Sequence, residues 1–163
     1  LMSGDLPYKN SVRFTAVPRE TIVVLDHEVN TQWALKTFLE NEDYNVLAVN
    51  TIENAQKKFS EFEVSGLITE YWIRHSSTLE AIRGFKKAFP EGYVMLLTNR
   101  EIRESEYEEI LDAGADDFFL KPFSVKKILL HLRKGLKQRQ NLLLKKRLAD
   151  ELNRISPVKR YPG

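Results

Sequence analysis

The chain has 163 residues, of which 42% are hydrophobic and 29% are charged, which fits one soluble globular domain with an appendage or one large domain. The absence of cysteine excludes disulfides, thiolate metal sites and cysteine nucleophiles. No apolar run approaches the roughly 18 residues of a membrane span, and the first residues lack the basic and apolar regions of a signal peptide. We therefore expect a cytoplasmic protein that does not contact a membrane.

The net charge of +2 is divided unevenly along the chain. Residues 1–120 hold 12 Lys and Arg against 21 Asp and Glu, whereas residues 121–163 hold 13 Lys and Arg against two acidic residues. An acidic body with a basic tail says little about the fold, but it indicates that the tail has a partner.

Five short apolar runs have the composition of strands that are buried on both faces, as in a parallel sheet. These runs are residues 21–25, 44–49, 67–69, 93–97 and 118–120. Polar segments with apolar residues at helical spacing follow each run. The alternation of five strands and five helices predicts an α/β fold, a doubly wound five-stranded parallel sheet with helices on both faces.

Local signals predict where the helices begin and end. Thr51 is a candidate N-cap of the second helix, and Ser76 or Ser77 of the third. Pro90 should end the third helix and Gly114 the fourth, which begins near residue 101. The fourth helix is expected to turn four apolar side chains inward: Ile102, Tyr107, Ile110 and Leu111.

The last helix, from Ser124 to about Ile155, is longer than a crossover needs and contains no proline. Leu136 and Leu143 form only a short heptad series, which ends at polar Asp150. We therefore predict three parts. They are an irregular N-terminal arm (1–20), the α/β domain (21–135) and a basic helical extension and tail (136–163), of which residues 156–163 are expected to be disordered.

Polar residues follow four of the five predicted strands. Asp26 and His27 come after the first strand, Glu70 ends the third, Thr98 ends the fourth, and Lys121 follows the fifth. In a doubly wound sheet the site lies beyond the carboxyl ends of the strands, so these residues should form one constellation.

The segment 114–123, Gly-Ala-Asp-Asp-Phe-Phe-Leu-Lys-Pro-Phe, closely resembles the Gly-Ala-Asp-Asp-Tyr-Leu-x-Lys-Pro-Phe of response-regulator receiver domains. Together with Thr98 and the strand pattern, the resemblance covers about residues 21–135. It implies a CheY-like, flavodoxin-like fold and a role in two-component signalling, in which a histidine kinase transfers a phosphoryl group to the receiver.

The resemblance also implies roles for individual residues. In the family an acidic pair binds Mg²⁺, and Asp26 retains the first position of that pair. Thr98 and Lys121 match the Thr and Lys that contact the phosphoryl oxygens. Phe118 matches an aromatic residue that rotates inward when the Thr moves.

Among the positions that depart from the family pattern, two bear directly on the chemistry. His27 stands at the second acidic position, where an imidazole is a poor ligand for Mg²⁺. Glu70 stands at the phosphoacceptor Asp, and its extra methylene displaces the carboxylate by about 1.5 Å. We therefore expect no phosphorylation, no cofactor and no enzymatic activity. Instead, Glu70 should act as a fixed charge to which Lys121 and Thr98 donate.

Three alternatives remain for these residues. The chain could still be a working Mg²⁺-dependent phosphoacceptor. Glu70 could be no more than a solvated strand end. Asp26, His27 and Glu70 could bind a transition metal.

The expected partners are signalling proteins, either a histidine kinase or an output domain, bound at the face of the fourth helix, fifth strand and fifth helix. The basic C-terminal helix has three interpretations: an extension toward an output domain, a homodimer contact, or a contact with nucleic acid. The helix could also lie on the acidic body of its own or a neighbouring subunit.

Overall fold

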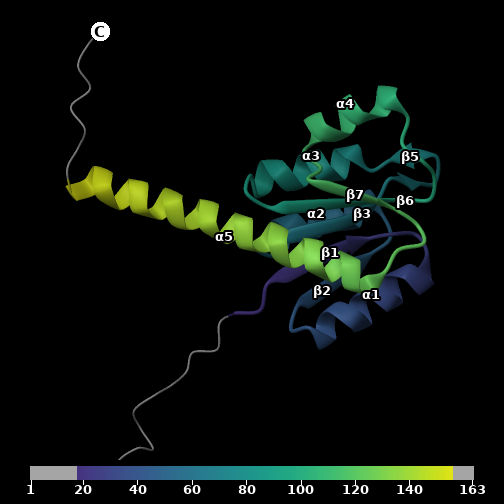
Figure 1. Ribbon diagram of the computed structural model, residues 1–163, viewed down its shortest axis with the longest axis horizontal. Coiled ribbons are helices and arrows are strands. Elements are labelled where there is room, and N and C mark those ends of the chain that lie inside the picture. Colours follow the sequence, from purple (N-terminus) through teal and green to yellow (C-terminus); the bar gives the residue numbers. More distant parts are fainter. Residues whose placement is uncertain (1–17, 156–163) are drawn as a thin grey trace, which may run out of the picture.

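A computed structural model describes residues 18–155 (Figure 1). The strands are β1 (Thr21–Leu25), β2 (Asn45–Val49), β3 (Gly66–Glu70), β4 (Trp72–Ile73), β5 (Ser76–Ser77), β6 (Tyr93–Thr98) and β7 (Asp117–Leu120). The helices are α1 (Val29–Asn41), α2 (Ile52–Glu61), α3 (Leu79–Ala88), α4 (Glu104–Ala113) and α5 (Val125–Ile155). The predicted arm, apart from residues 18–20, and the predicted disordered tail lie outside the described residues.

Five strands form one parallel sheet in the order β2-β1-β3-β6-β7, which confirms the predicted doubly wound fold. Helices α1 and α5 pack on one face, where Leu35 and Leu132 meet Val24. Helices α2, α3 and α4 cover the other face, where Phe59 and Phe85 are buried. Strands β3 and β6 are buried along their whole length, including the polar residues at their carboxyl ends, as expected of central strands in a parallel sheet.

The strand register brings the predicted site residues to one edge of the sheet. Leu25 pairs with Thr69, so Asp26 and Glu70 follow at the same level. The amide of Tyr71 donates to Leu97, and that of Lys121 donates to Thr98. Because all these strands are parallel, their carboxyl ends and the loops that follow them lie side by side.

Helix ends were predicted with mixed success. Thr51 caps α2 by accepting from the amide of Asn54, and Gly114 ends α4 with a φ of 113°, as predicted. The prediction that Ser76 or Ser77 caps α3 is wrong, because both lie in β5 and the N-cap is Thr78.

Strands β4 and β5 form a small antiparallel hairpin that was not predicted from the sequence. Its turn residues, Arg74 and His75, have φ of 47° and 67°. Asn and Gly dominate such turns, so the sequence carried no hairpin signal. The hairpin follows Glu70 directly, and it leads into Thr78, whose amide and hydroxyl bond back to Tyr71 and Glu70.

Helix α4 begins at Glu104 rather than near residue 101, and only one of its faces is buried. Ile110 packs in the core, as predicted. Tyr107 and Leu111, however, are exposed, so the prediction that they point inward is wrong. A helix of ten residues on the sheet edge covers the core with one stripe, here Ile110 and Ala113.

Helix α5 runs for 31 residues without a break, and Figure 1 shows it continuing well past the sheet. Its first part is packed on the domain as far as Arg139, and all residues from 140 to 155 are exposed. Gly135 allows close packing, because a Cβ there would clash with the ring of Tyr93. None of the helices in residues 18–155 is both long enough and apolar enough to span a membrane.

Candidate functional site: the pocket at the strand ends

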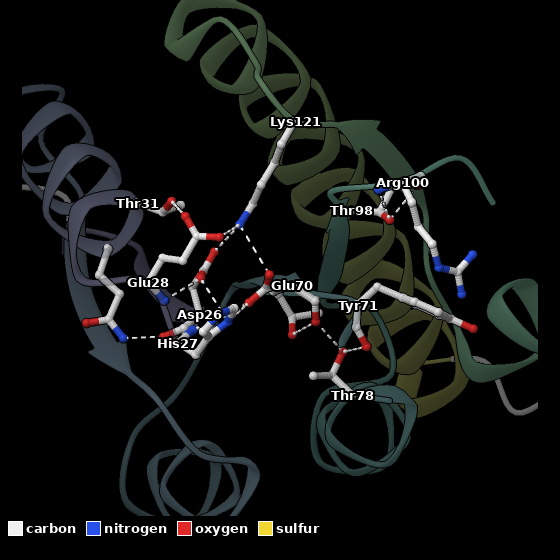
Figure 2. Close-up of polar contacts among 12 residues, drawn as sticks. Asp26, His27, Glu28, Thr31, Glu70, Tyr71, Thr78, Thr98, Arg100 and Lys121 are labelled. Atoms are coloured by element: carbon white, nitrogen blue, oxygen red, sulfur yellow. Dashed lines mark hydrogen bonds and ion pairs between the residues drawn. The ribbon is translucent and has the colours of Figure 1, made fainter. Parts of the chain in front are cut away.

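Three residues from distant parts of the sequence meet at the carboxyl edge of the sheet (Figure 2). The Nζ of Lys121 lies 2.9 Å from Oδ2 of Asp26 and 3.4 Å from Oε1 of Glu70. Asp26 and Glu70 are only 1% and 2% exposed, and the Lys121 side chain is 12% exposed. These residues, together with His27 and Glu28, are called the pocket below.

His27 holds the second oxygen of the Glu70 carboxylate. Its ring Nδ1 is hydrogen-bonded to Oε2 of Glu70, and its backbone amide lies 3.5 Å from the same oxygen. Because a carboxylate only accepts, the ring nitrogen is the donor. Oε1 faces Lys121, so both oxygens of Glu70 have partners within the protein.

Burial and charge shift the protonation equilibria of the pocket. Burial raises the pKa of Glu70, and the nearby charge of Asp26 adds to this, while His27 and Lys121 act in the opposite direction. Burial alone would lower the pKa of Lys121, but the carboxylates of Asp26, Glu70 and Glu28 outweigh it and raise that pKa. The ammonium group therefore stays charged and compensates the buried acids.

Thr98 lies at the end of β6, but its hydroxyl is turned away from Glu70. Its Oγ1 donates to the carbonyl of Arg100 at 2.7 Å and accepts from the Arg100 amide at 3.3 Å. A hydroxyl has one hydrogen to donate. The predicted hydrogen bond from Thr98 to Glu70 is therefore not formed, whereas the one from Lys121 is.

Arg100 organises the loop between β6 and α4, and it was not among the predicted site residues. Its guanidinium forms a two-pronged ion pair with Glu106, at 3.0 and 2.6 Å, and lies over the rings of Tyr71 and Trp72. The ion pair and the Arg103 amide lower the pKa of Glu106 to about 2. One residue thus ties the loop after β6 to α4 and to the hairpin after Glu70.

Phe118 faces outward from β7 and is partly exposed. Its ring packs against that of Tyr107, with centroids 5.4 Å apart. The two rings border a cavity of about 320 Å³ that opens beside Thr98. The remaining lining residues are Arg100, Glu101, Ile102 and Leu120.

Glu28 is a pocket residue that was not among the predicted site residues. Its carboxylate lies 3.6 Å from the Nζ of Lys121, and its amide donates to Asp26 at 2.8 Å. Its place two residues after Asp26, just beyond the first strand, was the signal that could have identified it. One ligand atom each from Asp26, His27, Glu28 and Glu70 lies within 4.8 Å of the others, so these atoms are close enough together to hold a metal ion.

Comparison with known proteins identifies the family of this chain. A model of the response regulator receiver domain matches residues 22–133. The chain belongs to this family. The receiver is 23% identical over 136 residues to the regulatory protein VirG of Agrobacterium tumefaciens, a match that covers 82% of this chain and 50% of that protein. The chain spans about half the length of the curated relatives it matches.

Solved structures agree on the fold. A CheY-like receiver domain from Methanospirillum hungatei superposes with a TM-score of 0.71 at 19% identity, covering 76% of this chain and 98% of that one. The beryllofluoride-activated NtrC4 receiver domain dimer gives a TM-score of 0.67 at 24% identity, covering 73% and 98%. The expectation of a receiver module of two-component signalling, drawn from residues 114–123, is confirmed.

Proposed function

We propose that this receiver is held in one signalling conformation by its own side chains and acts without accepting a phosphoryl group. The observation that carries the proposal is the double engagement of Glu70. One carboxylate oxygen is bonded to the ring of His27, and the other faces the ammonium of Lys121. Glu70 thereby supplies, as a permanent group, the negative oxygens that a phosphorylated receiver gains on modification.

Acceptance of a phosphoryl group requires a free carboxylate oxygen in line with the leaving group. Glu70 is buried, and neither oxygen is free. Its extra methylene also moves the oxygens by about 1.5 Å from where an aspartate would hold them. Attack by Glu70 would therefore require it to break two contacts and to change its position.

The residues of the pocket fit Mg²⁺ poorly. This ion takes oxygen ligands in a nearly octahedral arrangement. Here His27 offers a nitrogen that already donates to Glu70, and Lys121 already compensates Asp26, Glu28 and Glu70. An imidazole with carboxylates suits a transition metal better, but the ammonium of Lys121 competes for the same oxygens. We infer a pocket that works without a metal.

The output of such a receiver would pass through protein contacts on α4, β7 and α5. Four large apolar side chains are exposed there, which is the mark of a contact surface. They are Tyr107, Leu111, Phe118 and Leu120. Arg100 and its partner Glu106 fix the adjoining loop, so this surface is presented in one arrangement. A signalling protein, either a histidine kinase or an output domain, is the partner we propose for it.

The test is incubation with acetyl phosphate and Mg²⁺, followed by the mass of the intact protein. The wild type should gain no phosphoryl group. The double variant His27→Asp/Glu70→Asp, which restores two carboxylates of family length, should gain one. Thermal unfolding of both proteins checks that they are folded.

Either opposite result would overturn the proposal. A stable phosphoryl group on Glu70 of the wild type would make the chain a working phosphoacceptor, the principal alternative. A folded double variant that stays unlabelled would show that His27 and Glu70 are not the residues that remove the activity.

A further inference from the structure

The exposed end of α5, residues 140–155, carries an apolar stripe that nothing in the described part of the chain covers. We call this segment the stem. Four of its aliphatic side chains, Leu144, Leu148, Leu152 and Ile155, are each more than half exposed. A helix of this length is marginal in water on its own. Exposed aliphatic residues at helical spacing indicate a contact surface.

The stripe points away from the domain. At about 100° per residue, Leu148 lies half a turn around the helix from Arg139, which is packed on the domain. Lys146, which pairs with Glu91 of the domain, also lies off the stripe. A partner bound on the stripe would leave this ion pair intact.

The spacing within the stripe is that of a two-stranded coiled coil. Asn141, Leu148 and Ile155 recur every seven residues, with Leu144 in the position between the first two. Glu151 takes the equivalent position between the last two, with Leu152 beside it. The heptads start later than the Leu136 and Leu143 series, whose residues face or flank the domain.

We propose that the stem pairs in parallel with the stem of a second copy of this chain. In that arrangement Asn141 faces Asn141, and a single asparagine at this core position favours a parallel pair in register. The residues that flank the seam are compatible with it. Gln140, which donates to Glu20 of its own domain, lies opposite Lys145 of the second copy. Arg147 lies opposite Leu152, so no like charges face each other at these flanking positions. Within the seam itself Glu151 faces Glu151, which weakens the pair.

The same face of α5 is basic next to the domain. Lys134 and Lys137 continue the heptad positions toward the body, where two copies would repel each other. The seam therefore begins at Asn141, and the helices diverge below it to leave room for two domains.

Because the domain already forms and orients α5, pairing needs no helix nucleation. Two heptads bury little area, so the dimer is weak and reversible. This inference does not depend on the proposed state of the pocket.

Sedimentation over a series of protein concentrations tests the proposal. The wild type should self-associate. Leu148→Asp should weaken the dimer at least about tenfold, whereas Glu151→Leu, which completes the seam, should tighten it about tenfold. Leu142→Asp places the same charge on the other side of the stem and should leave the strength of the dimer unchanged. A monomeric wild type at all concentrations would overturn the proposal, and so would equal effects of Leu148→Asp and Leu142→Asp.

Two further measurements distinguish a dimer from nucleic-acid binding and test whether the two helices are parallel. Higher salt should strengthen the dimer, because it screens Lys134 and Lys137. A monomer that binds DNA, with affinity lost as salt rises, would contradict the dimer and favour nucleic acid. Because the chain has no cysteine, Asn141→Cys introduces a single thiol. Rapid disulfide formation between two copies supports the parallel register, and failure to form it at concentrations where the protein is dimeric overturns that register.

Discussion

The imidazole of His27 and the carboxylate of Glu70 are hydrogen-bonded across the ends of the neighbouring strands β1 and β3. Each of these residues replaces a shorter carboxylate of the family pattern. Together they form a contact that the shorter carboxylates of the family pattern would not make in the same way. The two departures therefore act as a pair, and we expect variants of either residue to depend on the other.

Glu70 gives the first prediction. Because burial raises its pKa, ionising Glu70 costs more free energy in the folded protein than in the unfolded chain. The stability it contributes is fully present below the usual pKa of 4.5 and is lost as pH rises through the higher folded pKa. Glutamine does not titrate. The difference in free energy of unfolding between Glu70→Gln and the wild type should therefore shift in favour of the variant between pH 4 and pH 8.

Urea denaturation at several pH values measures this difference. Glu108→Gln, at an exposed position of α4, serves as the control and should show no such trend. The opposite trend, in which Glu70→Gln becomes less stable than the wild type as pH rises, would contradict the prediction. It would mean that the partners of the carboxylate stabilise its charged form by more than burial destabilises it.

The second prediction concerns Lys121. Its replacement by methionine leaves Asp26 and Glu70 buried without their compensating charge. Breaking a buried ion pair in this way costs about 3–5 kcal/mol. Lys126→Met, on the exposed side of α5, should stay within about 0.5 kcal/mol of the wild type. Chemical denaturation measures the stability of both variants. Similar stabilities of Lys121→Met and Lys126→Met would show that the pocket does not need the ammonium group.

Two glycines give a matched pair of predictions. An alanine at 135 would clash with the ring of Tyr93, so Gly135→Ala should lower stability by about 1–3 kcal/mol and loosen α5 on the sheet. At Gly84 of α3 the nearest atom to an added Cβ is 3.8 Å away. Gly84→Ala should therefore raise stability by up to about 1 kcal/mol, because alanine favours helix. Opposite changes in melting temperature are expected, and equal changes would count against the packing of α5 described above.

The fourth prediction concerns the loop after β6. Arg100→Met removes the ion pair with Glu106 and the cation above Tyr71 and Trp72. The ion pair is partly exposed and screened by solvent, so stability should fall only slightly. The environment of Trp72 should change more visibly, which fluorescence in a Trp33→Phe background would detect. An unchanged spectrum would mean that Arg100 does not connect the loop to the hairpin.

Glu106 makes the same contact dependent on pH. Its pKa is lowered to about 2, so its contribution to stability is present above the usual pKa and is lost as pH falls toward 2. Glu106→Gln should thus be less stable than the wild type at pH 6 and approach it near pH 2. Equal stability at pH 6 would contradict the contact.

The sequence was enough for the sheet and for the meeting of Asp26, Glu70 and Lys121. Unbroken apolar runs determine parallel strands, and parallel strands bring their carboxyl ends together. The direction of a single hydroxyl was not predictable in this way. The side chain of Thr98 has backbone partners in its own loop as well as the pocket, and the loop provides the bond.

Local turns and helix faces were harder for the same reason. The hairpin from Trp72 to Ser77 has two-residue strands and a turn without the usual glycine, so it left no pattern. The inward face of α4 was misjudged because Tyr107 and Leu111 are exposed although they are apolar, and they belong to the surface that we propose as a contact surface. Apolar periodicity cannot separate a contact surface from the core.

The most direct test of the account is a titration of isotopically labelled protein with beryllofluoride and Mg²⁺, a mimic of the phosphoryl group, followed by backbone amide NMR signals. The signals of Thr98, Arg100 and Phe118 report the pocket side and the contact face. These signals should stay in place in the wild type and move in His27→Asp/Glu70→Asp. Saturable shifts of these signals in the wild type would contradict a receiver fixed by Glu70.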